Sequence, residues 1–458
     1  MYLTETIAAL ATAAASAGIG VIRISGEASF DLIDKIFQTP KGLPMKDMKS
    51  HTIHYGYIYD EGEPIDEVLV LLFRGPRSYT GEDTVEIDCH GGPFVLNRVL
   101  ETVLKAGARA AEPGEFSKRA FLNGRMDLSQ AEAVMDVIDA KNRYALKSSM
   151  SQLRGSIEKT VRSMRQDLLH HMAYIESALD DPEHYSLDGY GEKLLETLHE
   201  EQNDIGRLLS ASDDGRLLTE GIRTVILGKP NAGKSSLLNV LVGEDRAIVT
   251  DIEGTTRDLL EEQITIGGIS LNVIDTAGIR ETGDRVEQIG VDRAKNIAQE
   301  ADLVIYVVDM SRPMDQNDRD IIEMIKDKKA IVLLNKSDLK QALTRADLTA
   351  CLDKPMIEIS AKEETGIQAF LDTLKDMFFK GKIDFNSEVY ITNARQKNAL
   401  MEADRALKRV ENSILGGMPE DFYSIDLMDA YEALGNLTGE TVGEDLVNEI
   451  FSKFCMGK

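Results

Sequence analysis

The stretch Gly228-Lys-Pro-Asn-Ala-Gly-Lys234-Ser235 decides the fold of the region around it, because it fits the P-loop pattern G-x-x-x-x-G-K-[ST]. An apolar run at residues 224–227 predicts a β-strand before it, and residues 236–242 predict a helix after it. Glycines let such a loop wrap a phosphate, so that backbone N–H groups and the helix N-terminus point at the charge. The alternative is a glycine-rich turn that binds nothing, which the flanking strand and helix disfavour.

Further motifs follow the P-loop, and three of them stand at the ends of apolar runs typical of strands. These motifs are Asp275-Thr-Ala-Gly278 after residues 271–274, Asn335-Lys-Ser-Asp338 after residues 331–334, and Ser360-Ala-Lys362. Ligands bind at the carboxyl ends of the strands in an α/β sheet, so we expect the three motifs to share one site. Their order is the one that a GTPase requires.

The order of the motifs resembles that of the translation-factor-related GTPases. In that resemblance Asp338 accepts hydrogen bonds from the guanine N1–H and 2-amino groups, and Asn335 supports the loop. Lys234 reaches the β- and γ-phosphates, and Ser235 holds Mg²⁺. Adenine lacks the donor pair and would leave a buried carboxylate unpaired, which disfavours a metabolic ATPase.

The residue after Gly278 is Ile279, at the position where Ras-like enzymes place a glutamine that orients water. An apolar side chain cannot position water, so we expect that group to come from elsewhere. Arg257 and Arg280 are nearby candidates for an arginine finger. Glu287 falls at the start of the next predicted helix, where the residues alone favour a simple helix-terminus charge.

The composition is that of a globular protein of about three domains, since domains average on the order of 150 residues. The 458 residues are 43% hydrophobic, which is enough for a sizeable core. The net charge of −26 argues against a broad non-specific grip on nucleic acid, so any RNA contact is local or shared with a basic partner. Three widely spaced cysteines, with no run long enough for a membrane span, predict a cytoplasmic protein.

The periodicity of apolar residues predicts a multidomain fold with an insertion. An α+β domain is expected at residues 1–120, with strands at 21–24, 52–59, 67–73 and 84–87 and a helix at 94–106. Three- and four-residue apolar spacing predicts an all-α helical domain split over residues 121–217 and 381–458. Alternating strands and helices predict an inserted α/β P-loop domain at residues 218–380. Polar stretches at 180–190 and 212–221 predict loops.

Several longer motifs resemble those of the MnmE (TrmE) family of tRNA modification GTPases, over essentially the whole chain. The motifs are Arg23-Ile-Ser-Gly, Thr80-Gly-Glu-Asp, His90-Gly-Gly, the run from Phe121 to Leu128, the switch Thr250-Asp-Ile-Glu-Gly-Thr-Thr256-Arg-Asp258, and the ending Cys455-Met-Gly-Lys458. The ending is the most discriminating of them. The alternative is a regulatory GTPase for ribosome assembly, similar to the Era or EngA families. Those would show a basic KH-type module or a second P-loop, and neither is present.

The family resemblance implies a K⁺-activated GTPase whose G domains dimerise. It places Mg²⁺ on Ser235 and Thr256, and K⁺ on Asn231, Thr250, Ile252 and Thr255. It also makes Glu287 the residue that orients the attacking water, beside Lys234 in the catalytic set. The GTP-binding residues that it implies are Asn231, Ala232, Gly233, Lys234, Ser235, Ser236, Thr250, Asp251, Ile252, Glu253, Gly254, Thr255, Thr256, Asp275, Thr276, Ala277, Gly278, Asn335, Lys336, Asp338, Ser360, Ala361 and Lys362.

The resemblance further implies a site for a one-carbon tetrahydrofolate, in the 5-formyl or methylene form. Its residues are Arg23, Glu86, Arg125 and Lys458, although Arg125 stands where many relatives have lysine. Without the family, each of these would be interpreted as structural, and a terminal lysine as frayed.

The implied function is GTP hydrolysis within an enzyme that modifies the wobble uridine (U34) of tRNA at carbon 5. The implied partners are tRNA, a second copy of the chain through the N-terminal domain, and the MnmG (GidA) protein in a heterotetramer. That partner alone would carry FAD, and a carboxymethylaminomethyl-type group would be installed.

The cysteine and histidine residues are not assigned to a catalytic or metal site in this interpretation. Cys455 is a conceivable nucleophile, but nothing in folate chemistry requires a thiol there. Cys89 and His90 are adjacent in a predicted strand and so point to opposite faces. His170 and His171 lack metal-ligand spacing, and we expect both to face solvent.

Overall fold

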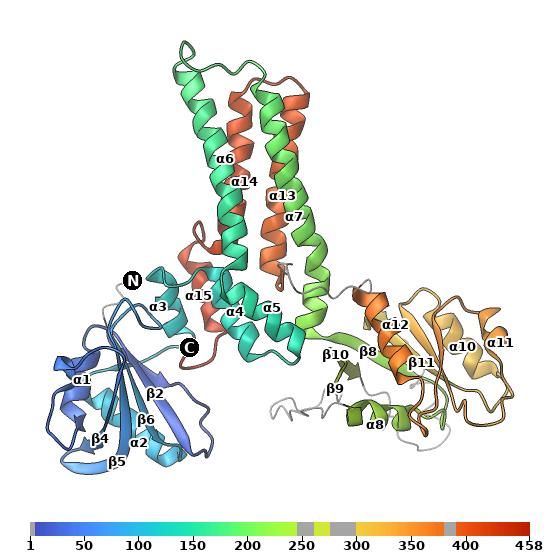
Figure 1. The fold of residues 1–458 in the computed structure, drawn as a ribbon, viewed down its shortest axis with the longest axis horizontal. Helices are drawn as coiled ribbons and strands as arrows, with labels where there is room; N and C mark the ends of the chain where they lie inside the picture. The colour runs from blue at the N-terminus through green and yellow to red at the C-terminus, as the bar shows by residue number, and fades with distance from the viewer. Residues whose placement is uncertain (1–4, 245–260, 275–298, 380–390) are drawn as a thin grey trace. The chain divides into compact units, whose positions relative to one another are not determined.

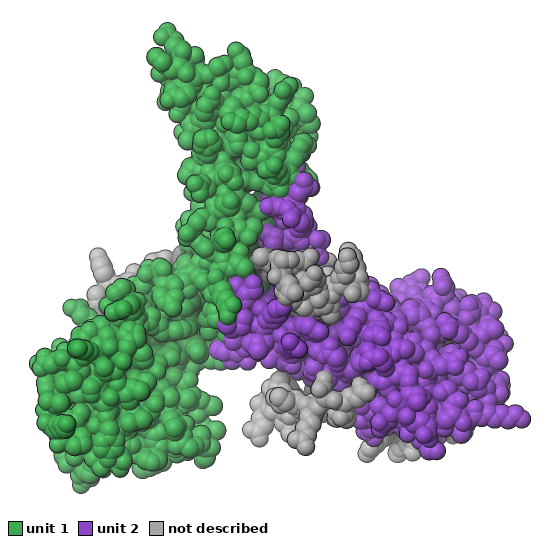
Figure 2. Space-filling view, in the orientation of Figure 1, with its two compact units in different colours: residues 1–135, 152–201, 399–458 green, residues 136–151, 202–398 purple. Residues whose placement is uncertain are grey.

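The computed structural model describes residues 5–244, 261–274, 299–379 and 391–458 (Figure 1). The chain divides into two compact units (Figure 2). Unit 1 holds residues 1–135, 152–201 and 399–458, and unit 2 holds residues 136–151 and 202–398. The two sheets and the helices confirm the predicted fold class, which combines an α+β part, an all-α part and an α/β P-loop part. The three predicted domain boundaries remain a prediction.

The N-terminal part of unit 1 is a seven-stranded sheet in the order β3-β4-β5-β6-β2-β1-β7. Side chains alternate across each strand, and one face packs on helices α1 (Ser29–Ile36) and α2 (Pro93–Ala106) to form a core. The strands are β1 (Ile7–Leu10), β2 (Ile19–Ser25), β3 (Phe37–Gln38), β4 (Thr52–Asp60), β5 (Glu63–Phe73), β6 (Thr84–His90) and β7 (Arg109–Ala110). The four predicted strands and the predicted helix are all found in it. The predicted alternation at Cys89 and His90 is also confirmed, since Cys89 is buried and His90 exposed.

The helical part of unit 1 contains α3 (Glu115–Leu122), α6 (Ser156–Asp180), α14 (Asp421–Thr438) and α15 (Glu444–Ser452). Helices α6 and α14 lie side by side (Figure 1). Helix α15 packs on α3 and on α4 (Leu128–Ile138) through Phe451, Phe454 and Leu128. Because α15 is the last helix, this cluster brings the end of the chain to the N-terminal sheet. Helices α4, α5 (Arg143–Leu153), α7 (Tyr190–Glu220) and α13 (Ala394–Leu415) each have residues in both units.

Two expectations for the helices were wrong. The predicted loop at residues 212–221 belongs to α7, which continues to Glu220. Ile205, Leu208 and Ser212 are buried at helical spacing, so packing overrides the weak helix propensity of the polar stretch. His171 is also buried rather than solvent-facing. Its ring lies between the hydroxyls of Tyr190 (Nδ1 to Oη, 2.7 Å) and Thr197 (Nε2 to Oγ1, 3.1 Å).

Unit 2 is built around a six-stranded sheet in the order β13-β12-β11-β8-β10-β9. All its pairs are parallel except the β9–β10 hairpin, which turns at Gly267 and Gly268. Its strands are β8 (Ile222–Leu227), β9 (Glu261–Ile266), β10 (Ile269–Ile274), β11 (Leu303–Asp309), β12 (Ala330–Asn335) and β13 (Met356–Glu358). Its helices include α8 (Lys234–Glu244), α10 (Gln316–Ile325), α11 (Arg345–Thr349) and α12 (Ile367–Phe379).

Apolar clusters cover both faces of the unit 2 sheet, and every residue of β11 is buried. Such two-sided burial is typical of parallel sheets. Strand β8 lies between β10 and β11, so the chain order reverses beside it. Ligands bind at such a reversal in open α/β sheets, and the P-loop directly follows β8.

Candidate functional site

The P-loop joins β8 to α8, and its backbone demands glycine at two points. Gly228 has φ +150°, and a Cβ there would lie 2.4 Å from the carbonyl oxygen of Val307. Gly233 has φ +99°, and a Cβ there would lie 2.1 Å from Nδ2 of Asn335. Asn231 between them is also left-handed, with φ +65°. The pattern of residue types therefore follows from the shape of the loop.

The side chain of Lys234 folds back over the loop. Its Nζ donates to the carbonyl oxygens of Gly228 (2.6 Å) and Lys229 (3.0 Å). Burial lowers the pKa of Lys234 from its usual 10.5. Lys234 is also the first residue of α8, so its ammonium group and the helix N-terminus favour an anion at the same place.

Three loops at the carboxyl ends of β8, β12 and β13 are joined through one buried side chain, Asn335. Its Nδ2 donates to the carbonyl oxygen of Ala232 (2.8 Å), and its Oδ1 accepts from the N–H of Ala361 (3.1 Å). Asp338 is oriented in the same way, because its Oδ1 accepts from Oγ of Ser360 (2.7 Å). A carboxylate and an amide are thus fixed beside the phosphate-binding loop.

Lys336 lies between Asn335 and Asp338 in the sequence, and its side chain ties the loop after β12 to the end of the neighbouring strand β11. Its backbone is left-handed, with φ +65°, and its Nζ pairs with Oδ2 of Asp309 at 2.6 Å. Burial alone would raise the pKa of Asp309, but the hydrogen bond from Lys336 and those from Ser311 outweigh it and lower the pKa. Asp309 is therefore charged at neutral pH and holds the lysine in place.

A second cluster of polar groups surrounds Tyr79 in unit 1. Arg23 pairs through Nε with Oε1 of Glu86 at 2.7 Å, across the β2–β6 ladder. The Arg23 guanidinium lies over the Tyr79 ring at 4.8 Å, and Nζ of Lys458 lies over the same ring at 5.7 Å. Burial and the nearby Arg23 lower the pKa of Lys458. Two cations from opposite ends of the chain therefore face one aromatic ring.

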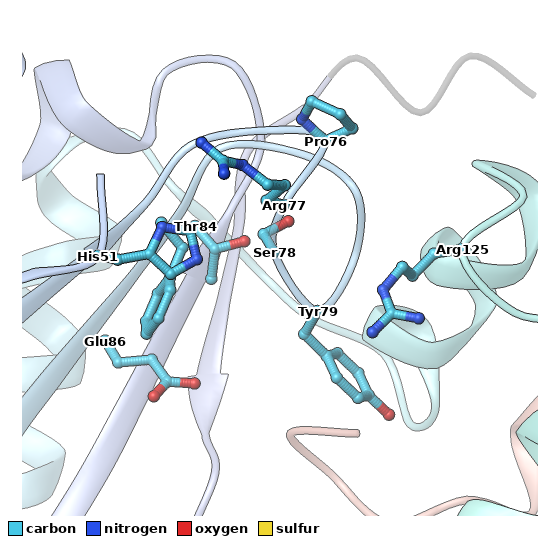
Figure 3. Close-up of a pocket in the computed structure, with 9 residues that line it drawn as sticks. His51, Pro76, Arg77, Ser78, Tyr79, Thr84, Glu86 and Arg125 are labelled. Atoms are coloured by element: carbon cyan, nitrogen blue, oxygen red, sulfur yellow. The ribbon is translucent and has the colours of Figure 1, made fainter. Parts of the chain in front are cut away.

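A pocket of about 570 Å³ adjoins this cluster. Figure 3 shows Glu86 on its strand and Arg125 on the other side of Tyr79. The lining residues are His51, Phe73, Pro76, Arg77, Ser78, Tyr79, Thr84, Glu86 and Arg125. The pocket thus combines aromatic and apolar surface with three cationic or ionisable nitrogen groups and one carboxylate.

The last residues of the chain are held against this cluster by backbone hydrogen bonds. The Gly457 carbonyl accepts from Nη1 of Arg23 (3.2 Å), and the Lys458 carbonyl accepts from the N–H of Phe116 (3.2 Å). Gly457 has φ +81°, and a Cβ there would lie 2.2 Å from the Leu10 carbonyl oxygen. The terminal lysine is therefore docked rather than frayed.

Comparisons with known proteins agree over the full length of the chain. The family model described as "GTP-binding protein TrmE N-terminus" matches residues 6–125, and the model described as "MnmE helical domain" matches residues 128–455. A protein of Lachnoclostridium phytofermentans named tRNA modification GTPase MnmE is 58% identical over 99% of this chain and 100% of its own length.

The chain belongs to the MnmE family. Proteins of the same name from Alkaliphilus oremlandii (47% identical) and Clostridioides difficile (45%) also cover 100% of both chains. Among solved structures, the G domain of the T. maritima FeoB iron transporter is 27% identical and covers 35% of this chain and 98% of that chain. The TM-score of that match is 0.27.

The structure brings together many of the site residues expected for this MnmE-family chain. Arg23, Glu86 and Lys458 meet at Tyr79, and Arg125 lines the adjoining pocket. The described residues expected around the nucleotide are Asn231, Ala232, Gly233, Lys234, Ser235, Ser236, Asn335, Lys336, Asp338, Ser360, Ala361 and Lys362. Those outside the described residues are Thr250, Asp251, Ile252, Glu253, Gly254, Thr255, Thr256, Asp275, Thr276, Ala277, Gly278 and Glu287.

Sequence reasoning missed Tyr79, which stands directly before the Thr80-Gly-Glu-Asp motif that it did single out. An aromatic residue beside a motif of polar residues was the available signal. Within the described parts of the MnmE-family chain, no helix is both long and apolar enough to cross a membrane.

Proposed function

We propose that this chain is the GTP-hydrolysing component of an enzyme that modifies the wobble uridine of tRNA at carbon 5. The observation that carries the proposal is the 58% identity to a tRNA modification GTPase over the full length of both chains. The fixed P-loop and the Asn335–Asp338 loop support guanine-nucleotide binding independently. A regulatory GTPase of ribosome assembly is not favoured, because both MnmE family models match.

GTP recognition would rest on groups that are already oriented. The Asp338 carboxylate, held by Ser360, would accept two hydrogen bonds from guanine, and Lys234 would turn from the loop carbonyls to the β- and γ-phosphates. Ser235 and Thr256 would hold Mg²⁺, whose charge offsets that of the phosphates. We further propose that Glu287 orients the attacking water.

K⁺ would take the place of an arginine finger in this proposal. Its ligands would be oxygen atoms of Asn231, Thr250, Ile252 and Thr255, and oxygen donors suit a hard cation. Asn231 is the described member of the set, and its left-handed backbone lies between the two glycines of the loop.

The cluster at Tyr79 would bind a one-carbon tetrahydrofolate in the 5-formyl or methylene form. A planar ring fits against an aromatic side chain, Arg23 and Lys458 supply cationic groups, and Glu86 supplies an acceptor. Arg125 lines the pocket at a place where it could pair with a carboxylate of the ligand. When bound, the folate supplies the one-carbon unit.

Assembly would use the open face of the N-terminal sheet. Ile53, Tyr55 and Leu69 are 63%, 44% and 42% exposed on neighbouring strands β4 and β5, whereas the opposite face is the buried core. An exposed apolar sheet face of this kind supports a homodimer. The proposal includes the FAD-dependent MnmG protein as a further partner, in a heterotetramer that would supply flavin chemistry and a basic surface for tRNA.

An Asp338→Asn variant tests the nucleotide assignment. Asparagine at this position presents a donor in place of one acceptor, so we expect affinity to move from GTP toward xanthosine triphosphate. The assay is competition of both nucleotides against a fluorescent GDP analogue, with Asp353→Asn as an exposed control. Unaltered GTP preference in Asp338→Asn would contradict the assignment.

A further inference from the structure

A buried polar network lies beside the P-loop and is given no role in the function proposed above. Asp318, in the first turn of α10, has a side chain only 3% exposed. Its Oδ1 accepts from the hydroxyl of the fully buried Tyr306 (2.8 Å), and its Oδ2 accepts from the N–H of Asp315 (3.1 Å). The remaining partner is Nζ of Lys229, at 2.7 Å from Oδ2.

Lys229 belongs to the P-loop, not to the helix. Its ammonium group also pairs with the more exposed Asp315 at 2.9 Å. Burial alone would lower the pKa of Lys229, but the hydrogen bonds to Asp318 and Asp315 outweigh it and raise the pKa. The loop is therefore tied by a charged, partly buried anchor to a helix 89 residues further along the chain.

The backbone of Lys229 carries the anchor to the rest of the loop. Its carbonyl oxygen accepts from Nζ of Lys234 (3.0 Å) and from the N–H of Ala232 (3.2 Å). On the far side, the Ala232 carbonyl is held by Asn335. The strained segment that contains Asn231 is thus fixed at both ends, one end by Lys229 and the other by Asn335.

We propose that Lys229 is a positioning residue for nucleotide binding. Its ion pair with Asp318 fixes the start of the P-loop, including the Lys229 carbonyl oxygen that accepts from Lys234. The inference rests on the proposed GTP binding and names a residue that the motif leaves free to vary. A P-loop that is already ordered before binding does not lose conformational entropy when the phosphate binds. The competing interpretation is that Lys229 only neutralises Asp318 and stabilises α10.

The test compares the affinity for a fluorescent GDP analogue with the turnover at saturating GTP in the full chain. Lys229→Met is expected to raise the dissociation constant about 10-fold, which corresponds to about 1.4 kcal/mol. Turnover at saturation is expected to stay within about 2-fold, since the anchor contributes equally to ground and transition states. Lys229→Arg, which keeps the charge and the reach, is expected to restore binding to within about 3-fold.

Two further variants make the test specific. Asp318→Asn is expected to match Lys229→Met, and the double variant to bind no more weakly than either one, because both remove the same pair. Lys326→Met is the control: Lys326 follows α10 and pairs with the exposed Glu323. It is expected to bind as the wild type does.

A purely structural role for Lys229 predicts a different result. It would lower the melting temperature of Lys229→Met while leaving its nucleotide affinity equal to that of Lys326→Met, and this outcome overturns the inference. If Lys229→Met does not fold, Asp315→Asn removes the half-exposed partner and is expected to weaken binding by about 2- to 3-fold; unchanged affinity there also overturns it. A wild-type chain that binds no guanine nucleotide would overturn the proposed function as well.

Discussion

The docking of the chain end can be tested by Gly457→Ala. Gly457 has φ +81°, and the added Cβ would lie 2.2 Å from the Leu10 carbonyl oxygen and 2.7 Å from Cα of Ala11. Both neighbours are backbone atoms, which cannot turn away as a flexible side chain would. The terminal residues must therefore shift from their place beside Arg23.

The cost follows from two terms. A left-handed alanine costs about 1 kcal/mol relative to glycine. Movement of the tail weakens two hydrogen bonds, Arg23 to the Gly457 carbonyl and the Phe116 N–H to the Lys458 carbonyl, each of which contributes about 1 kcal/mol. If relaxation of the tail recovers half of the free energy of the two hydrogen bonds together, the docked state loses about 2 kcal/mol in total. The undocked population then rises about 30-fold.

Limited trypsin digestion measures this population, because Lys453 is exposed and precedes the docked segment. Cleavage that follows the open population is expected to be about 30-fold faster in Gly457→Ala. Binding of 5-formyltetrahydrofolate is expected to weaken at the same time. Gly42→Ala is the control, since Gly42 has φ +67° but no atom within 4 Å of the added Cβ. Equal cleavage rates and equal folate binding in Gly457→Ala and wild type would refute the reasoning.

Two other substitutions test the nucleotide site and the stability of unit 1. Asn335→Ala removes the hydrogen bonds to Ala232 and from Ala361, so the affinity for GDP is expected to fall about 30-fold, from roughly 2 kcal/mol of lost positioning. Glu115→Gln tests acid stability: burial would raise the pKa of Glu115, but hydrogen bonds from Arg109 and others outweigh it and lower the pKa below its usual 4.5. The charged form then stabilises the fold above pH 4.5, and this contribution is lost as the pH falls through the folded-state pKa. The variant should therefore melt below wild type at pH 7, with the difference shrinking in acid.

The contrary outcomes are distinct for the two variants. Wild-type GDP affinity in Asn335→Ala would show that the amide does not position the P-loop. A difference in melting temperature between Glu115→Gln and wild type that stays constant from pH 7 to pH 3 would show that the ionised carboxylate carries no extra stability.

The P-loop could be predicted from the sequence because its backbone shape dictates residue types. Gly228 and Gly233 are required by positive φ and close carbonyl or amide neighbours, and both stand in one short stretch. The position of Asn335 after an apolar strand was likewise a local signal. The contacts of Asn335 with Ala232 and Ala361 follow from the strand order, once β8, β12 and β13 belong to one parallel sheet.

Other features depend on contacts between distant parts of the chain, which local patterns do not contain. The pairing of Lys229 with Asp318 requires β8 and β11 to be neighbours. The approach of Lys458 to Tyr79 depends on packing of the last helix against α3. The burial of His171 was missed for the same reason. Its ring nitrogens are satisfied by the hydroxyls of Tyr190 and Thr197, and the local sequence does not show that these two residues face it.

The proposed role of this chain is tRNA modification that depends on GTP hydrolysis. The most direct test is mass spectrometry of tRNA nucleosides from cells that lack the chain, with rescue by the wild type or by Lys234→Ala. We expect that nucleosides carrying the C5 group of the wobble uridine are lost, return with the wild type, and stay absent with Lys234→Ala. Normal wobble uridines in the cells that lack the chain would contradict a role in tRNA modification.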